Sequence, residues 1–181
     1  KGGAHFKFDQ NAYLVVKGSL RVLGFDSSPV IFESTGSSWK GLYVLSDDSD
    51  KSILKNVIIK DTTGVSDGLL ELTGGVTLYK GNINLTNVSI EGSDAEDALN
   101  IVKAMVSIDG LSIRSSVSDG FDCDYCRGIM SKSYFGHIGG DGLDLSGSDV
   151  VLEHMIFEDI KDKGVSVGEA SKVVLNNGNF K

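Results

Sequence analysis

The stretch Leu54-Lys55-Asn56-Val57-Ile58-Ile59 decides the fold, because related stretches recur along the chain at nearly constant spacing. The related stretches are Leu85-Thr86-Asn87-Val88-Ser89-Ile90, Ile108-Asp109-Gly110-Leu111-Ser112-Ile113, Met130-Ser131-Lys132-Ser133-Tyr134-Phe135, Leu152-Glu153-His154-Met155-Ile156-Phe157 and Leu175-Asn176-Asn177-Gly178-Asn179-Phe180. The successive first residues lie 31, 23, 22, 22 and 23 residues apart. A period of this size predicts stacked structural units, each of which buries its apolar face against its neighbours.

A second series of short apolar runs lies between the members of the first. These runs begin at Gly41, Gly68, Ala98, Gly120, Gly142 and Gly164. Both series are rich in β-branched and aromatic residues and are bounded by Gly, Asn, Asp or Ser, which is typical of strands. No helices are expected between them, and each repeat returns to the same phase. The sequence therefore predicts an all-β parallel β-helix with about 22 residues per coil and six or seven coils, in a single domain over residues 1–181.

The corners of the coil are predicted from the Asn positions. Asn56 and Asn87 suit a corner because Asn tolerates the left-handed backbone and its amide can bond the neighbouring backbone. The residues in the same slot of the later repeats are Gly110, Lys132, His154 and Asn177. The longest step contains Gly68-Leu69-Leu70, interpreted as a strand, and Thr73-Gly74-Gly75 with about nine extra residues, interpreted as a projecting loop.

Composition narrows the class of protein. Apolar residues make up 40% of the 181 residues, so a folded soluble domain is expected. The net charge of −8 disfavours nucleic acid and anionic membranes as partners. No run of about 18 apolar residues is present, so no membrane span is predicted. Because the chain starts at Lys1 and the last repeat stops at Phe180-Lys181, we interpret it as a fragment of a longer repeat protein.

The two cysteines carry little chemistry by themselves. Cys123 and Cys126 are too few for a disulfide framework, and a lone pair lacks the second half of a zinc site. Because Cys123 falls on an inward position of the repeat, we expect a buried thiol.

Stacking of the coils converts the repeat into a surface, since parallel strands lie about 4.8 Å apart. The outward position of the second series is occupied by Tyr43, Leu70, Asn100, Asp122, Asp144 and Ser166. The position before each glycine is occupied by Lys40, Asp67, Asp97, Asp119, Asp141 and Lys163. Asp124 lies two residues beyond Asp122 and also points outward. The sequence thus predicts one patch of aspartates across adjacent coils.

Such a patch needs compensation for charge repulsion. Two carboxylates about 4.8 Å apart repel by roughly 3.5 kcal/mol at an effective dielectric constant of about 20. A calcium ion, a raised pKa on one carboxyl, or a nearby cation such as Lys163 would relieve this repulsion. The candidate calcium ligands are Asp119, Asp122, Asp141 and Asp144. The alternative is that each Asp-Gly pair only starts a strand and its charge is solvated.

Short motifs of the chain resemble the right-handed parallel β-helix superfamily of pectate lyases, polygalacturonases and alginate epimerases. Val117-Ser118-Asp119-Gly120-Phe121-Asp122 resembles the Asn-Thr-Asp-Gly-Phe-Asp segment of polygalacturonases. Gly140-Asp141-Gly142-Leu143-Asp144 stands where that family has Gly-Asp-Asp, and Val167-Gly168-Glu169 stands where it has Gly-His-Gly. Phe121-Asp122 also resembles the Gly-Phe-Asp-Pro-His segment of alginate epimerases, but Cys123-Asp124 replaces Pro-His. The chain therefore lacks the catalytic His of these families.

The longest match is Asp162-Lys163-Gly164-Val165-Ser166-Val167-Gly168-Glu169-Ala170-Ser171. It resembles the β-helix repeats of bacterial surface proteins that also carry a spore-coat-type kinase-like domain. This resemblance implies an extracellular or cell-surface location in a bacterium. Together with the crossover rule for parallel strands, the superfamily resemblance implies a right-handed coil.

Three functions are compatible with these patterns. The first is an extracellular carbohydrate-binding module, with calcium on the aspartate patch; its predicted binding residues are Asn100, Asp124, Ser166, Lys163 and Tyr43. The second is a polysaccharide lyase or hydrolase that uses Asp119, Asp122, Asp141 and Asp144, with Asp141 as acid and Asp122 as base. The third is a structural spacer. The apolar edge of the last coil is also expected to pair end to end with another chain.

Overall fold

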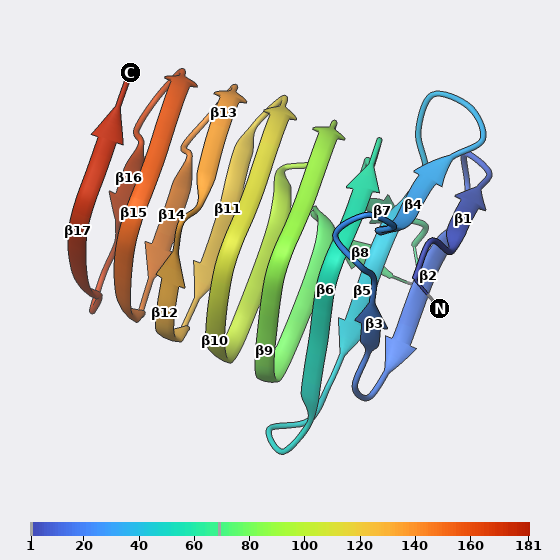
Figure 1. Cartoon of the computed structure of the whole chain (residues 1–181), viewed down its shortest axis with the longest axis horizontal. Coiled ribbons are helices and arrows are strands. Elements are labelled where there is room, and N and C mark those ends of the chain that lie inside the picture. The colour runs from blue at the N-terminus through green and yellow to red at the C-terminus, as the bar shows by residue number, and fades with distance from the viewer. Residues whose placement is uncertain (1, 69) are drawn as a thin grey trace.

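The protein is an all-β parallel solenoid of about eight turns (Figure 1). The computed structural model describes residues 2–68 and 70–181. The coils stack along one axis, with the first strands at one end and the last strands at the other (Figure 1). The predicted fold class is confirmed, with roughly 23 residues per turn, but the expected six or seven coils are too few.

The strands follow one another with short connections. The first are β1 (His5–Phe8), β2 (Tyr13–Lys17), β3 (Arg21–Leu23), β4 (Val30–Ser34), β5 (Gly41–Leu45), β6 (Lys51–Lys60), β7 (Val65–Ser66), β8 (Glu71–Leu72) and β9 (Gly74–Ser93). The others are β10 (Asp97–Ser116), β11 (Asp119–Asp124), β12 (Arg127–Ser131), β13 (Tyr134–Ile138), β14 (Leu143–Ser146), β15 (Asp149–Ile160), β16 (Val165–Val167) and β17 (Lys172–Phe180). The longest strands bend around a corner of the coil and so contribute to more than one face.

Strand pairing divides the solenoid into three faces. Face 1 has the order β2-β5-β9-β10-β11-β14-β16. Face 2 has the order β3-β6-β9-β10-β12-β15-β17. Face 3 has the order β1-β4-β6-β9-β10-β13-β15-β17. All of these pairs are parallel, so equivalent residues of successive coils stack.

Residues with left-handed backbone mark the corners between the faces. The predicted corner contains Asn56, Asn87, Gly110, Lys132, His154 and Asn177, whose φ angles lie between 49° and 76°. The Asn87 amide donates to Asn56 Oδ1 at 3.2 Å, so the stacked amides bond one another where both are present. The prediction of a stacked Asn corner is confirmed. The other two corners contain Asp61, Gly92, Ser115, His137 and Asp159, and Lys80, Lys103, Tyr125 and Ala170.

Inward side chains form continuous columns in the core. On face 3 the rings of Phe135, Phe157 and Phe180 stack with centroids 5.2 and 4.9 Å apart. Phe157 is buried, whereas Phe180 in the last coil is 55% exposed. This exposed ring fits the expected apolar edge, but end-to-end pairing with a second chain stays a prediction.

The longest repeat step was interpreted incorrectly in detail. The coil after β5 continues with Gly74 to Tyr79 of β9, since Leu42 pairs with Val76. Gly68 and Leu70 therefore do not belong to a strand of face 1, and Leu69 lies outside the described residues. The extra residues form a projecting segment over 61–73, in which β7 and β8 pair as an antiparallel hairpin. A projecting loop was expected here, but its residues precede Gly74.

The prediction of a free buried thiol is wrong. Cys123 and Cys126 form a disulfide bond, and both are buried. Cys123 keeps its predicted inward place, in register with Ile101 and Leu145. The left-handed residue Tyr125 lies between the two cysteines, so the disulfide links the end of face 1 to the corner that follows it.

We expect the purified chain to contain no titratable thiol when it is denatured without a reductant. The disulfide joins residues only three apart. A chain-entropy estimate for so short a loop gives a stabilisation of about 2 kcal/mol. The Cys123→Ala, Cys126→Ala variant should therefore lose at least about 2 kcal/mol of unfolding free energy in urea titration, because it also leaves cavities. Two reactive thiols in the denatured, unreduced parent would contradict the disulfide.

Candidate functional site

The outward column of face 1 carries most of the polar residues predicted from the sequence. Asn100, Asp122, Asp144 and Ser166 pair in register on successive coils. Asp124 lies beside this column, in register with Val102 and Ser146. Thr77 precedes Asn100 in the column, in place of the predicted Leu70. Strands β9, β10, β11, β14 and β16 thus place five polar side chains in one line.

A second column runs along the edge where the strands of face 1 begin. Asp97 pairs with Asp119, and hydrogen bonds continue the column through Asp141 to Lys163. The Asp119 carboxylate accepts a bond from the Asp141 N–H at 2.8 Å, and Asp141 accepts one from the Lys163 N–H at 2.9 Å. Asp119 and Asp141 therefore cap the start of the following coil, which gives them a structural role.

Lys163 neutralises one end of this edge column. Its ammonium lies 3.0 Å from Asp141 Oδ1 and also contacts Asp162. Burial alone would raise the pKa of Asp141, but the hydrogen bonds and charge of Lys163 outweigh it and lower that pKa. Asp141 is consequently ionised at neutral pH.

The carboxyls farther from Lys163 behave in the opposite way. Burial raises the pKa of Asp122 to about 7, and the charges of Asp124 and Asp144 add to the effect. Burial likewise raises the pKa of Asp97 to about 7, with a further contribution from the charge of Asp122. Asn100 lies between these two carboxyls and its amide donates to Asp122 Oδ2 at 2.9 Å. Asp97, Asn100 and Asp122 thus form a cluster in which two carboxyls have pKa values near neutral pH.

The neighbouring carboxyls are also shifted upward. Burial raises the pKa of Asp119, against the bond donated by the Asp141 N–H. Burial and then the charge of Asp144 raise the pKa of Asp124. Protonation is therefore one form of the compensation that the sequence required.

Two atoms of the outward column are buried without a hydrogen-bond partner among the described residues. They are Thr77 Oγ1 and Asp144 Oδ1. A buried polar group without a partner costs about 1–3 kcal/mol, so such atoms are uncommon in folded proteins. A proton on the neighbouring Asp122 would supply a donor near Asp144, which stacks directly on it.

Tyr43 holds the predicted place in the outward column, but its side chain is completely buried. Its hydroxyl donates to the Lys40 carbonyl. Trp39 is also fully buried, and its indole N–H donates to the Lys60 carbonyl at 2.7 Å. Tyr43 therefore offers no surface to a substrate, and its predicted role in binding is not supported.

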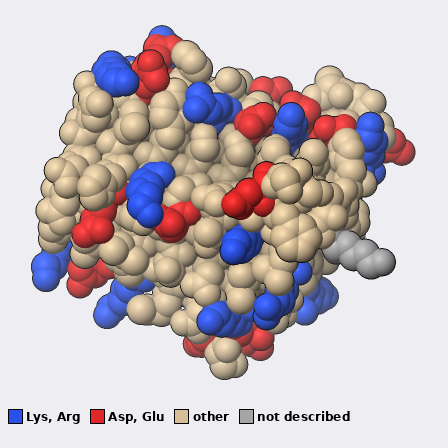
Figure 2. Space-filling view, in the orientation of Figure 1, with Lys and Arg blue, Asp and Glu red and all other residues tan. Residues whose placement is uncertain are grey.

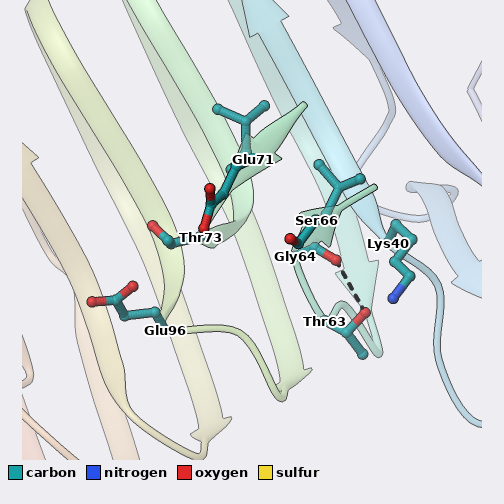
Figure 3. Close-up of a pocket in the computed structure, with 9 residues that line it drawn as sticks. Lys40, Thr63, Gly64, Ser66, Glu71, Thr73 and Glu96 are labelled. Carbon is teal, nitrogen blue, oxygen red and sulfur yellow. Dashed lines mark hydrogen bonds between the residues drawn. The ribbon is translucent and has the colours of Figure 1, made fainter. Parts of the chain in front are cut away.

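A surface pocket lies where the hairpin meets the starting edge of face 1 (Figure 3). Its volume is about 290 Å³, and its polar lining consists of Lys40, Thr63, Ser66, Glu71, Thr73 and Glu96. In Figure 3, Glu71, Thr73 and Glu96 lie on one side and Lys40 and Thr63 on the other. Lys40, Thr73 and Glu96 are the residues immediately before β5, β9 and β10, so the pocket adjoins the edge column.

Charge is distributed differently elsewhere. On the face shown in Figure 2, basic and acidic side chains are interspersed over a largely neutral surface. Within residues 2–68 and 70–181, no group of three or more His, Cys, Asp or Glu side chains is placed to hold a metal ion. The calcium expected on the aspartate patch stays a prediction.

The described part of the chain, residues 2–68 and 70–181, includes no helix that is long and apolar enough to cross a membrane.

No protein-family model, curated protein or solved structure matches the chain. The motif resemblances to β-helix enzymes and bacterial surface proteins therefore stand only as sequence observations, and what the structure adds is the parallel β-solenoid itself.

The sequence placed Asp97 in the patch by its spacing but did not predict a binding or catalytic role for it, because nothing distinguished it from the other aspartates. Asp97 is only 5% exposed, and this burial is the largest cause of its raised pKa. The sequence offers even less reason to place Lys40 and Glu96 in a binding site, because their pocket forms only with the hairpin over 61–73.

We expect the unfolding free energy to fall as pH rises from about 4 to about 7. Asp97 and Asp122 titrate near 7 in the folded chain, whereas an unfolded Asp titrates near 3.9. The folded chain holds more protons in this window, so raising the pH favours unfolding. Urea titration at several pH values measures the slope.

The Asp97→Asn, Asp122→Asn variant should have a flatter profile than the parent over this window, because Asn mimics the neutral carboxyl. Asp149→Asn, which changes an exposed residue of face 2, serves as the control and should keep the slope of the parent. Equal slopes in the parent and the double variant would show that neither carboxyl is shifted.

Proposed function

We propose that the outer surface of face 1 binds a linear carbohydrate chain. The observation that carries the proposal is the in-register column of Asn100, Asp122, Asp144 and Ser166. Its side chains repeat at the coil spacing of about 4.8 Å. A polymer of hydroxyl-bearing units laid along the column would meet an amide, a carboxyl or a hydroxyl at each coil.

The chemistry of the column favours a neutral or amino-bearing glycan over an acidic one. Carboxylates accept hydrogen bonds, the Asn100 amide both donates and accepts, and sugar hydroxyls match both. An anionic polymer would be repelled by Asp122, Asp124 and Asp144, and Lys163 is already paired with Asp141 and Asp162. In this proposal Asn100, Asp124 and Ser166 contact the glycan, as predicted from the sequence, whereas Lys163 mainly orients Asp141.

An extracellular or cell-surface location in a bacterium fits this proposal. A disulfide between Cys123 and Cys126 persists in oxidising compartments, and polysaccharides are abundant ligands there. The resemblance of residues 162–171 to repeats of bacterial surface proteins supports the same location.

A second candidate function is glycosidic-bond chemistry, favoured by the raised pKa values of Asp97 and Asp122. A general acid or base works best when its pKa lies near the operating pH, and both values are about 7. Glycosidases use two carboxyl groups, one protonated and one ionised. Asp141 is a poor acid because Lys163 lowers its pKa. Under this alternative Asp97 and Asp122 would be the working pair.

We expect Asn100→Ala to weaken glycan binding roughly fivefold or more, because it removes a direct partner and leaves Asp122 without its donor. The measurement is isothermal titration with soluble linear glucan, mannan, amino-sugar and polyuronate chains. Asn84→Ala, which changes an outward residue of face 2, is the matched control and should bind like the parent.

Two results would contradict carbohydrate binding on face 1. One is that none of these polymers binds the parent, which would leave the structural spacer as the better interpretation. The other is that Asn100→Ala and Asn84→Ala weaken binding equally. Release of reducing ends during the titration, lost in Asp122→Asn, would favour the enzyme.

Calcium on Asp119, Asp122, Asp141 and Asp144 is tested separately by thermal unfolding. An ion that binds only the folded chain raises its midpoint. If calcium is held here, millimolar calcium will raise the midpoint of the parent but not that of the Asp122→Asn, Asp144→Asn variant. An unchanged midpoint in both proteins would contradict the calcium prediction.

A further inference from the structure

The outward column of face 1 is open at one end and closed at the other. Asn100, Asp122, Asp144 and Ser166 are all partly exposed. In the two preceding coils the exposed fraction falls to 4% at Thr77 and 0% at Tyr43. The change coincides with the projecting segment over 61–73, which is inserted between face 3 and face 1 at this level.

The projecting segment is tied to the solenoid at several points. At its base, the Thr63 N–H donates to the Trp39 carbonyl at 3.0 Å. Near its tip, the Tyr13 hydroxyl donates to Asp67 Oδ2 at 3.0 Å. Val65 within it is buried, and it pairs with Leu72 across the hairpin. These contacts hold the hairpin as a wall beside the starting edge of face 1, next to the coils in which Tyr43 and Thr77 are buried.

The pocket of about 290 Å³ lies at the foot of this wall. Lys40 supplies only donors, Glu71 and Glu96 supply only acceptors when ionised, and the hydroxyls of Thr63, Ser66 and Thr73 supply both. A simple anion would meet the two carboxylates, and a simple cation would meet the lysine. A group with several neighbouring hydroxyls can bond to all of these side chains.

We propose that this pocket binds the terminal unit of a glycan chain that lies on face 1, so that the protein recognises chain ends rather than internal segments. This inference rests on the proposed carbohydrate binding by face 1. The rest of the chain would extend away from the hairpin, over Asn100 towards Ser166, where the column stays open.

The experiment measures how many protein molecules bind one glycan chain of increasing length. The probe is whichever soluble linear polymer binds the parent among glucan, mannan and amino-sugar chains, prepared as fractions of defined length. Sedimentation velocity with excess protein reports the stoichiometry. We expect one protein per chain at every length, because each chain has one end of the matching type.

Two variants examine the pocket and the wall. Glu96→Gln should weaken binding of short chains about tenfold, because it replaces a charged acceptor of the terminal unit; Glu153→Gln on face 2 is the matched control. Replacing residues 65–72 by a short Gly-Ser linker removes the wall. That variant should bind several copies per long chain, in proportion to chain length.

The outcomes separate this inference from the proposed function. Binding of the parent in proportion to chain length would overturn end recognition while leaving carbohydrate binding intact. Absence of any binding would overturn both. If circular dichroism shows that the linker variant is unfolded, the parent stoichiometry and the Glu96→Gln result decide, and unchanged binding in Glu96→Gln would overturn the pocket assignment.

Discussion

The structure depends on the backbone at three corners, which must turn each coil by the same amount so that its strands meet those of the next coil in register. A slip of one residue would move every inward side chain to the outer surface, because strand side chains alternate. Left-handed residues recur at each corner, from Asn56 to Asn177 in the predicted one. Lys132 and His154 adopt this backbone although their side chains cannot continue the amide stack, so the corner conformation is required more strictly than the residue type.

The same register brings like charges together on face 1. The strand register places Asp122 directly beside Asp144, because the two residues pair on adjacent strands. Different forms of compensation operate along the patch: Lys163 holds Asp141 in the ionised form, and burial shifts the pKa of Asp97 and Asp122 upward. A repeating backbone thus carries a graded series of carboxyl environments, because each coil has different neighbours beside its aspartate.

The repeats and the outward alignment of Asn100, Asp122, Asp144 and Ser166 could be predicted because both follow from spacing. Features that depend on the third dimension could not. The spacing places Tyr43 outward, but the side chain is buried, with its hydroxyl bonded to the Lys40 carbonyl and its ring against Tyr13, which the spacing does not reveal. The Cys123–Cys126 disulfide depends on how the backbone turns at Tyr125. The raised pKa of Asp97 depends on how deeply the side chain is buried. The regular repeats can therefore be predicted from the sequence, whereas the structure of the insertions and corners that interrupt the repeats cannot.

Those departures are where specificity can arise. A perfectly regular solenoid offers the same surface at every coil, so a repeating polymer could shift by one coil at no cost in contacts. The insertion over 61–73 removes this degeneracy, because it is tied to Tyr13 and to Trp39, which lie in coils that precede Asn100. Asn100 then becomes the first open position next to the wall, and every later coil has a defined distance from it. A single insertion thus makes the coils of a uniform surface different from one another. A linear polymer can then bind at one position and in one direction only.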